Sequence, residues 1–86
     1  VRVVANAGGL NPEGCAAALR RHIDAAGLAL RVAVVTGDDV LARLPEWQAS
    51  GVLAASALAV PPTALLSANA YLGAYPIAAA LDAGAD

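Results

Sequence analysis

The sequence VRVVANAGGLNPEG, residues Val1 to Gly14, decides the fold that we predict for this chain. Its first part, Val1 to Ala7, is apolar with two polar interruptions, which is typical of a strand buried on both faces of a parallel sheet. Gly8 and Gly9 follow, and glycine allows a positive φ or the close approach of a ligand to the backbone. The stretch therefore predicts a strand, then a ligand-facing loop, then the beginning of a helix.

The helix that follows this loop has a clear beginning and a clear end. Asn11 is placed as the N-cap and Pro12 as the first helical residue, since proline needs no N–H partner there. The helix is predicted to run to about Ala26, where Gly27 ends it.

The same arrangement is repeated twice. VAVVTGDDV (Val32 to Val40) and LLSANAYLGAYP (Leu65 to Pro76) each take a small-residue apolar run into a polar turn that contains glycine. We expect strands at Leu28–Thr36 and Ala64–Ala68. A short helix is expected from about Val40 to Leu44, ended or kinked by Pro45, and a further turn of helix around Trp47, from Glu46 to Ser50, is left open. Another helix is expected from Pro76 to about Ala83. This alternation predicts an α/β fold, a parallel sheet with helices on both faces in three layers of Rossmann-like βαβ units.

Length and composition limit the classes of protein that fit. The chain has 86 residues, of which 59% are hydrophobic but only 3% aromatic, and its net charge is −2 without a basic patch. These values indicate one small domain and no nucleic-acid partner. Prolines and polar residues interrupt the apolar run Gly51 to Ala70, so we predict no membrane segment. A single cysteine, Cys15, excludes an internal disulfide and favours a cytoplasmic location.

The ends of the chain indicate a part of something larger. Val1 lies inside a predicted strand, and Asp86 follows a predicted helix where a further strand is expected. We therefore treat residues 1–86 as a single partial α/β domain.

Ligands bind open parallel sheets outside the carboxyl ends of the strands. Three groups of residues are predicted to meet at that edge. They are Asn6, Gly8, Gly9 and Asn11 for substrate binding, Asp38 and Asp39 for catalysis, and Ser67, Asn69 and Tyr71 for substrate binding. We assign no metal ligands and no cofactor.

Each group has a chemical role and a structural alternative. The glycines and the helix N-terminus present N–H groups that suit an anion. Asp38 or Asp39 would orient a metal, water or hydroxyl, or would cap the following turn. Ser67 and Asn69 would hydrogen-bond a carbonyl, or would satisfy neighbouring backbone.

Two other kinds of site lack the residues that they need. The loop matches neither G-x-G-x-x-G nor G-x-x-x-x-G-K-[ST], which speaks against a nucleotide-binding domain. Cys15 and His22 lie two helical turns apart, roughly 10 Å along the axis. That distance is too long for a direct nucleophile–base pair, so we expect Cys15 to be a buried apolar residue.

Three long motifs, ANAGGLNPEGCAAAL, VAVVTGDDVL and LLSANAYLGAYPIAAALDAGAD, together resemble the acyclic terpene utilisation (AtuA-like) family. The resemblance implies an internal part of that family's N-terminal domain. It also implies a role in the breakdown of branched terpenoids such as citronellol and geraniol through acyl-CoA intermediates. It supplies no catalytic residues to transfer, so the reaction is left open.

We therefore expect a domain that binds a small acyl or CoA-linked substrate at the strand edge. The alternative is a non-catalytic scaffold or subunit-interface domain in a catabolic assembly. The expected partner is a small-molecule ligand, with acyl-CoA as one candidate, and self-association into a homo-oligomer stays open.

Overall fold

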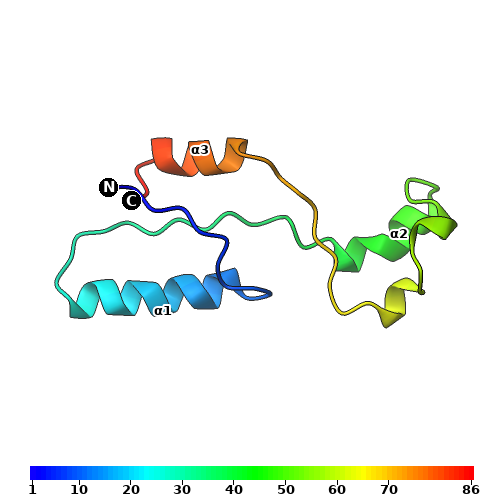
Figure 1. The fold of residues 1–86 in the computed structure, drawn as a ribbon, viewed down its shortest axis with the longest axis horizontal. Helices are drawn as coiled ribbons and strands as arrows, with labels where there is room; N and C mark the ends of the chain where they lie inside the picture. The colour runs from blue at the N-terminus through cyan, green and yellow to red at the C-terminus, as the bar shows by residue number, and fades with distance from the viewer. The chain divides into compact units, whose positions relative to one another are not determined.

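A computed structural model describes residues 1–86, apart from the side chain of Ala55. It contains three α-helices and three single turns of 3-10 helix (Figure 1). In chain order these are α1 (Pro12–Ala25), η1 (Leu41–Arg43), α2 (Leu44–Ala49), η2 (Ala55–Ala57), η3 (Pro62–Ala64) and α3 (Tyr75–Asp82). The chain divides into two compact units: unit 1 is Val1–Thr36 with Leu72–Asp86, and unit 2 is Gly37–Tyr71.

The predicted beginning of α1 is confirmed. The Asn11 side chain accepts a hydrogen bond from the Gly14 N–H at 2.9 Å, and Pro12 occupies the first turn. Because the first N–H groups of a helix have no partner within it, this cap stabilises the helix. The helix ends at Ala25, one residue before the predicted end, and Gly27 follows with a φ of 65°.

Proline has a different role in α2 from the one predicted. Pro45 does not end a helix but lies in the first turn of α2, the position at which its missing N–H is tolerated. The predicted cap before this region is present, since the Asp39 carboxylate accepts the Leu41 N–H at 3.1 Å. In α3, Pro76 again lies in the first turn, and Gly84 follows the helix with a φ of 100°.

The predicted parallel sheet is wrong. In the part of the chain that the structure describes, one isolated antiparallel bridge pairs Asp39 with Asn69, and there is no ladder. The predicted strands Val1–Ala7 and Leu28–Thr36 run as extended chain without pairing as strands (Figure 1). The third, Ala64–Ala68, begins inside η3. The three-layer, Rossmann-like α/β fold is therefore absent.

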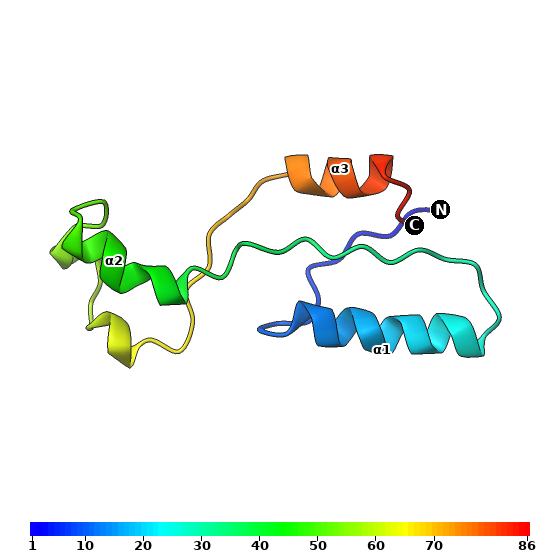
Figure 2. The ribbon, with the colours of Figure 1, turned by 180° about the vertical axis from the view of Figure 1, so that it is seen from behind.

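The predicted sheet is absent because an extended backbone does not by itself form a sheet. β-Branched residues favour an extended chain locally, but a strand also needs a neighbour that exchanges hydrogen bonds with it. In unit 1, the extended segment Leu28–Thr36 runs between α1 and α3 in both views (Figures 1 and 2). Its backbone bonds go to other partners than a strand: the Asp86 N–H donates to the Arg31 carbonyl at 3.0 Å, and the Arg20 guanidinium of α1 donates to the Val32 carbonyl at 3.0 Å.

The core is small. Three hydrophobic residues are buried among the described side chains, Ala16 and Ile23 of α1 and Leu44 of α2. Alanine buries little area, so an alanine-rich chain gains less from burial than its hydrophobic fraction suggests. No helix within the described residues has the length and apolar character needed to cross a bilayer.

Candidate functional site

In unit 2 the structure brings together two of the predicted site groups. Backbone bonds run from the Val40 N–H to the Ala68 carbonyl at 2.9 Å and from the Ala70 N–H to the Asp38 carbonyl at 2.7 Å. The Asn69 side-chain amide donates to the Asp38 carboxylate at 2.9 Å. Asp38, Asp39 and Asn69 are therefore neighbours, although no sheet edge brings them together.

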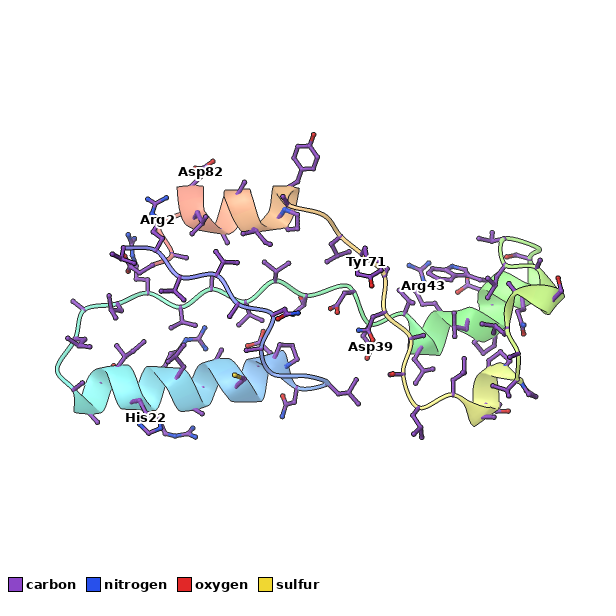
Figure 3. All side chains as sticks on the ribbon, viewed as in Figure 1. Arg2, His22, Asp39, Arg43, Tyr71 and Asp82 are labelled. Atoms are coloured by element: carbon purple, nitrogen blue, oxygen red, sulfur yellow. The ribbon has the colours of Figure 1, made fainter. Side chains whose placement is uncertain are left out.

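The two carboxylates have different surroundings. Asp38 is half-buried and receives the Asn69 amide, whereas Asp39 is exposed and caps the turn that begins at Leu41. The bond that Asp39 accepts from the Leu41 N–H agrees with the structural alternative given for this residue, which is that it caps the following turn. Figure 3 labels Asp39 and Tyr71, and the Tyr71 side chain is fully exposed. Ser67 is also exposed, and neither residue makes a side-chain hydrogen bond within the described part of the chain.

The glycine loop belongs to unit 1, with Asn6, Gly8, Gly9 and Asn11. Gly8 has a φ of 96°, and a Cβ there would lie 2.7 Å from the Pro12 Cα. Gly8 is thus required for the close approach of the loop to α1. The Asn11 N–H donates to the Gly8 carbonyl at 2.9 Å, so one amide that an anion would need is already bonded inside the loop.

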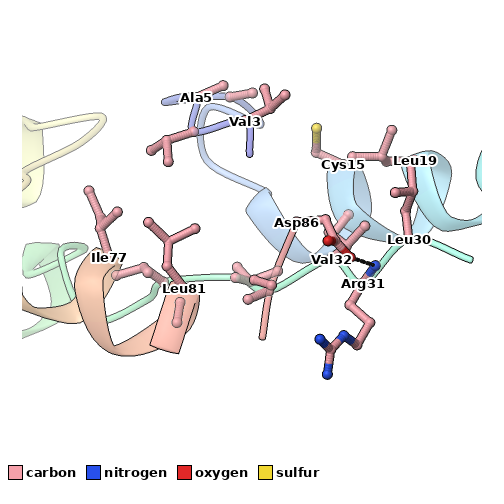
Figure 4. Close-up of a pocket in the computed structure, with 18 of the residues that line it drawn as sticks. Val3, Ala5, Cys15, Leu19, Leu30, Arg31, Val32, Ile77, Leu81 and Asp86 are labelled. Carbon is pink, nitrogen blue, oxygen red and sulfur yellow. Dashed lines mark hydrogen bonds between the residues drawn. The ribbon is translucent and has the colours of Figure 1, made fainter. Parts of the chain in front are cut away.

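Unit 1 also contains an apolar cavity of about 450 Å³ that sequence reasoning missed (Figure 4). Its walls come from the N-terminal extended segment, α1, the second extended segment and α3. The side chains that Figure 4 labels on these walls include Val3, Ala5, Cys15, Leu19, Leu30, Val32, Ile77 and Leu81. None of the nine predicted site residues lines it.

The sequence feature that could have predicted this cavity is the pattern of apolar residues, not the polar motifs. Leu19 and Ile23 lie on one stripe of α1, and both line the cavity. Cys15 lies on the same stripe but is exposed, so the prediction that it is buried is wrong. His22 is exposed and lies on the side of α1 away from the extended segment, remote from the cavity (Figure 3).

Two residues that line the cavity are charged, Arg31 and Asp86. The Asp86 carboxylate accepts the Arg31 N–H at 2.9 Å, the bond drawn in Figure 4. The Asp86 carbonyl accepts the Val3 N–H at 2.6 Å. An apolar cavity lined by few polar groups suits a hydrocarbon chain that carries a polar head.

A comparison with protein-family models matches residues 1–86, the whole chain, to the family described as acyclic terpene utilisation family protein AtuA. This match confirms the resemblance carried by the three sequence motifs. No curated protein and no solved structure shows significant similarity to the chain.

Proposed function

The chain belongs to the acyclic terpene utilisation family AtuA, and on that premise we propose that unit 1 binds the hydrocarbon chain of a branched acyl substrate. Family membership gives the chain a context of acyclic terpene utilisation. The observation that supports the finer proposal is the apolar, partly open cavity lined by α1, α3 and the two extended segments. The ligand that we propose is an acyl group, free or linked to CoA.

The size of the cavity fits this class of ligand. A volume of about 450 Å³ holds about fifteen groups the size of a water molecule, at roughly 30 Å³ each. A methylene group is similar in size to a water molecule, and an acyclic monoterpene skeleton has ten carbons. The cavity therefore accommodates such a chain with space left for the carbonyl end.

Burial energetics set the affinity to expect. Each CH₂ moved from water into an apolar site contributes about 0.8 kcal/mol. Association opposes this with a loss of about 4 kcal/mol or more of translational and rotational freedom. A ten-carbon chain would thus gain about 4 kcal/mol or less from this burial, which corresponds to a dissociation constant of roughly millimolar or weaker.

Two leucines of unit 1 provide a matched test. Leu19 lines the cavity and Leu28 does not, while both are about half exposed, at 49% and 54%. We expect Leu19→Gln to weaken binding of a branched ten-carbon acid about tenfold, because a polar amide replaces apolar wall. Leu28→Gln should leave binding unchanged. Calorimetric titration of the full-length protein, with the acid and with its CoA thioester, measures both.

The same titration can contradict the proposal. Equal dissociation constants for both variants and the unchanged protein, with equal melting temperatures, would remove the cavity as the binding site. A response to CoA alone, independent of the acyl chain, would do the same.

We also propose that the polar residues of unit 2 form a polar ligand site of their own within that unit. Asp38 and Asp39 would orient a water, a hydroxyl or a metal, and Asn69 with Ser67 would hydrogen-bond a carbonyl. The Asn69–Asp38 bond of 2.9 Å supports this, because it fixes an amide and a carboxylate side by side. A loss of affinity in Asn69→Ala without a loss of melting temperature is the result expected.

A second function, that of an interaction module in a catabolic assembly, is favoured by the exposed surface. Leu66 is 91% exposed in unit 2, and large exposed apolar side chains of this kind mark interaction surfaces.

Sedimentation of the full-length protein separates the two functions. A stable monomer that binds the branched acid supports the ligand-binding proposal and speaks against the interaction module. An oligomer that Leu66→Ser dissociates, with no response to any acyl ligand, supports the interaction module, and the partner is then a second copy of the chain.

A further inference from the structure

We infer that Asp86 is a positioning residue that holds the walls of the unit 1 cavity at the spacing an acyl chain requires; this inference rests on the proposed ligand-binding function. Asp86 lies four residues beyond the end of α3. Its three hydrogen bonds go to Arg31 and Val3, which lie in two segments distant in sequence. Asp86 and both of these partners line the cavity. We call Val3, Arg31 and Asp86 the clamp.

The clamp joins three of the four cavity walls. The Asp86 N–H donates to the Arg31 carbonyl at 3.0 Å, and the Arg31 N–H donates back to the Asp86 carboxylate at 2.9 Å. The Asp86 carbonyl accepts the Val3 N–H at 2.6 Å. The N-terminal extended segment, the second extended segment and the end of α3 are thus tied to one residue.

The backbone around the clamp leaves little freedom. Gly84 has a φ of 100°, and the Arg31 guanidinium occupies the space that a Cβ at Gly84 would fill. Arg31 therefore contacts the turn after α3 with its side chain while its backbone bonds Asp86. Because the walls carry no sheet ladder, these bonds have the task that strand pairing has in other folds, which is to fix the distance between extended segments.

A fixed distance matters because dispersion contacts fall steeply when a gap opens between ligand and wall. In a well-fitted apolar cavity each added CH₂ of a ligand raises affinity about fourfold. In a cavity whose walls have separated, part of each methylene stays in contact with water. The increase in affinity for each added CH₂ is therefore the property that we expect the clamp to control. It is measured separately from the free energy of unfolding.

The test measures dissociation constants of eight-, nine- and ten-carbon acids on the full-length protein and three variants. We expect a gain of about fourfold for each CH₂ in the unchanged protein, falling to about twofold in Asp86→Ala. Asp86→Asn should restore the gain, since its amide oxygen can still accept the Arg31 N–H. Asp82→Ala is the matched control, because Asp82 is an exposed aspartate of α3 that makes no side-chain hydrogen bond among the described residues (Figure 3).

Each outcome decides the inference. A reduced gain in Asp86→Ala that Asp86→Asn restores supports the clamp. An unchanged gain in Asp86→Ala overturns it, even when the melting temperature falls, because the role is then only structural. No binding of any acid to the unchanged protein overturns the proposed function itself, and the clamp with it. If Asp86→Ala does not fold, Val3→Pro takes its place, because proline lacks the N–H that donates to the Asp86 carbonyl. A reduced gain for each CH₂ in Val3→Pro then supports the clamp, and an unchanged gain overturns it.

Discussion

Unit 1 and unit 2 are built from similar alanine-rich sequence, but different contacts hold them together. Unit 1 surrounds an apolar cavity with side chains from segments far apart in the chain, tied through Asp86. Unit 2 has short helices and polar contacts, with the Asn69–Asp38 bond and the Arg43 guanidinium 5.1 Å from the ring centre of Trp47. Polar bonds join segments distant in sequence in both units, 31 residues apart for Asn69 and Asp38 and 55 for Arg31 and Asp86. The difference is that only in unit 1 do apolar side chains from such segments line a cavity.

The largest effect that would test this comparison comes from the buried residues. We expect Ile23→Ala in unit 1 and Leu44→Ala in unit 2 each to reduce the free energy of unfolding by about 2–3 kcal/mol, through lost burial and the space left behind. Urea denaturation measures the loss. Only Ile23→Ala should also weaken binding of the branched acid, because Ile23 lines the cavity and Leu44 does not. Equal weakening by both variants would contradict a cavity confined to unit 1.

The next effect compares two adjacent glycines of the unit 1 loop. Gly8→Ala should reduce stability by about 2 kcal/mol, because its φ of 96° is strained for alanine and its Cβ would overlap Pro12. Gly9→Ala, with a φ of 53° and open space around it, should reduce stability by about 1 kcal/mol or less. Thermal unfolding measures both. Equal losses would mean that the close approach of the loop to α1 contributes nothing.

A smaller effect is expected at the beginning of α1. Asn11→Ala removes the side chain that accepts the Gly14 N–H, which should reduce stability by about 1 kcal/mol. Asn6→Ala is the matched control, since Asn6 is exposed and makes no side-chain hydrogen bond among the described residues. If Asn6→Ala were the more damaging variant under urea, the loop would have a role other than capping.

The smallest stability effect belongs to unit 2. Asn69→Ala breaks an exposed bond to Asp38, so we expect a loss of about 0.5 kcal/mol. Its binding of the acyl ligand should weaken if the amide holds a carbonyl. Ser67→Ala, which removes no observed side-chain bond among the described residues, is the control for stability alone. A large fall in melting temperature with unchanged affinity would show that Asn69 has only a structural role. Ligand binding would then be a property of unit 1 alone.

Local features were predictable because they depend on a few neighbouring residues. Asn11 and Pro12 specify the beginning of α1, and Gly27 and Gly84 follow the ends of helices with positive φ. The cap by Asp39 is equally local. Pro45 was misjudged because proline ends one helix and begins another with the same geometry, so its neighbours alone do not distinguish the two.

The sequence by itself therefore determined α1 and α3, the bonds by which Asn11 and Asp39 cap the turns that follow them, and the family. Tertiary structure decided that the extended segments of unit 1 form no ladder and where the cavity lies. Apolar β-branched residues favour an extended backbone wherever they occur, but a ladder or a cavity wall needs partners from elsewhere in the chain. In this protein the partner of Val3 and Arg31 is Asp86, which no local pattern connects to either.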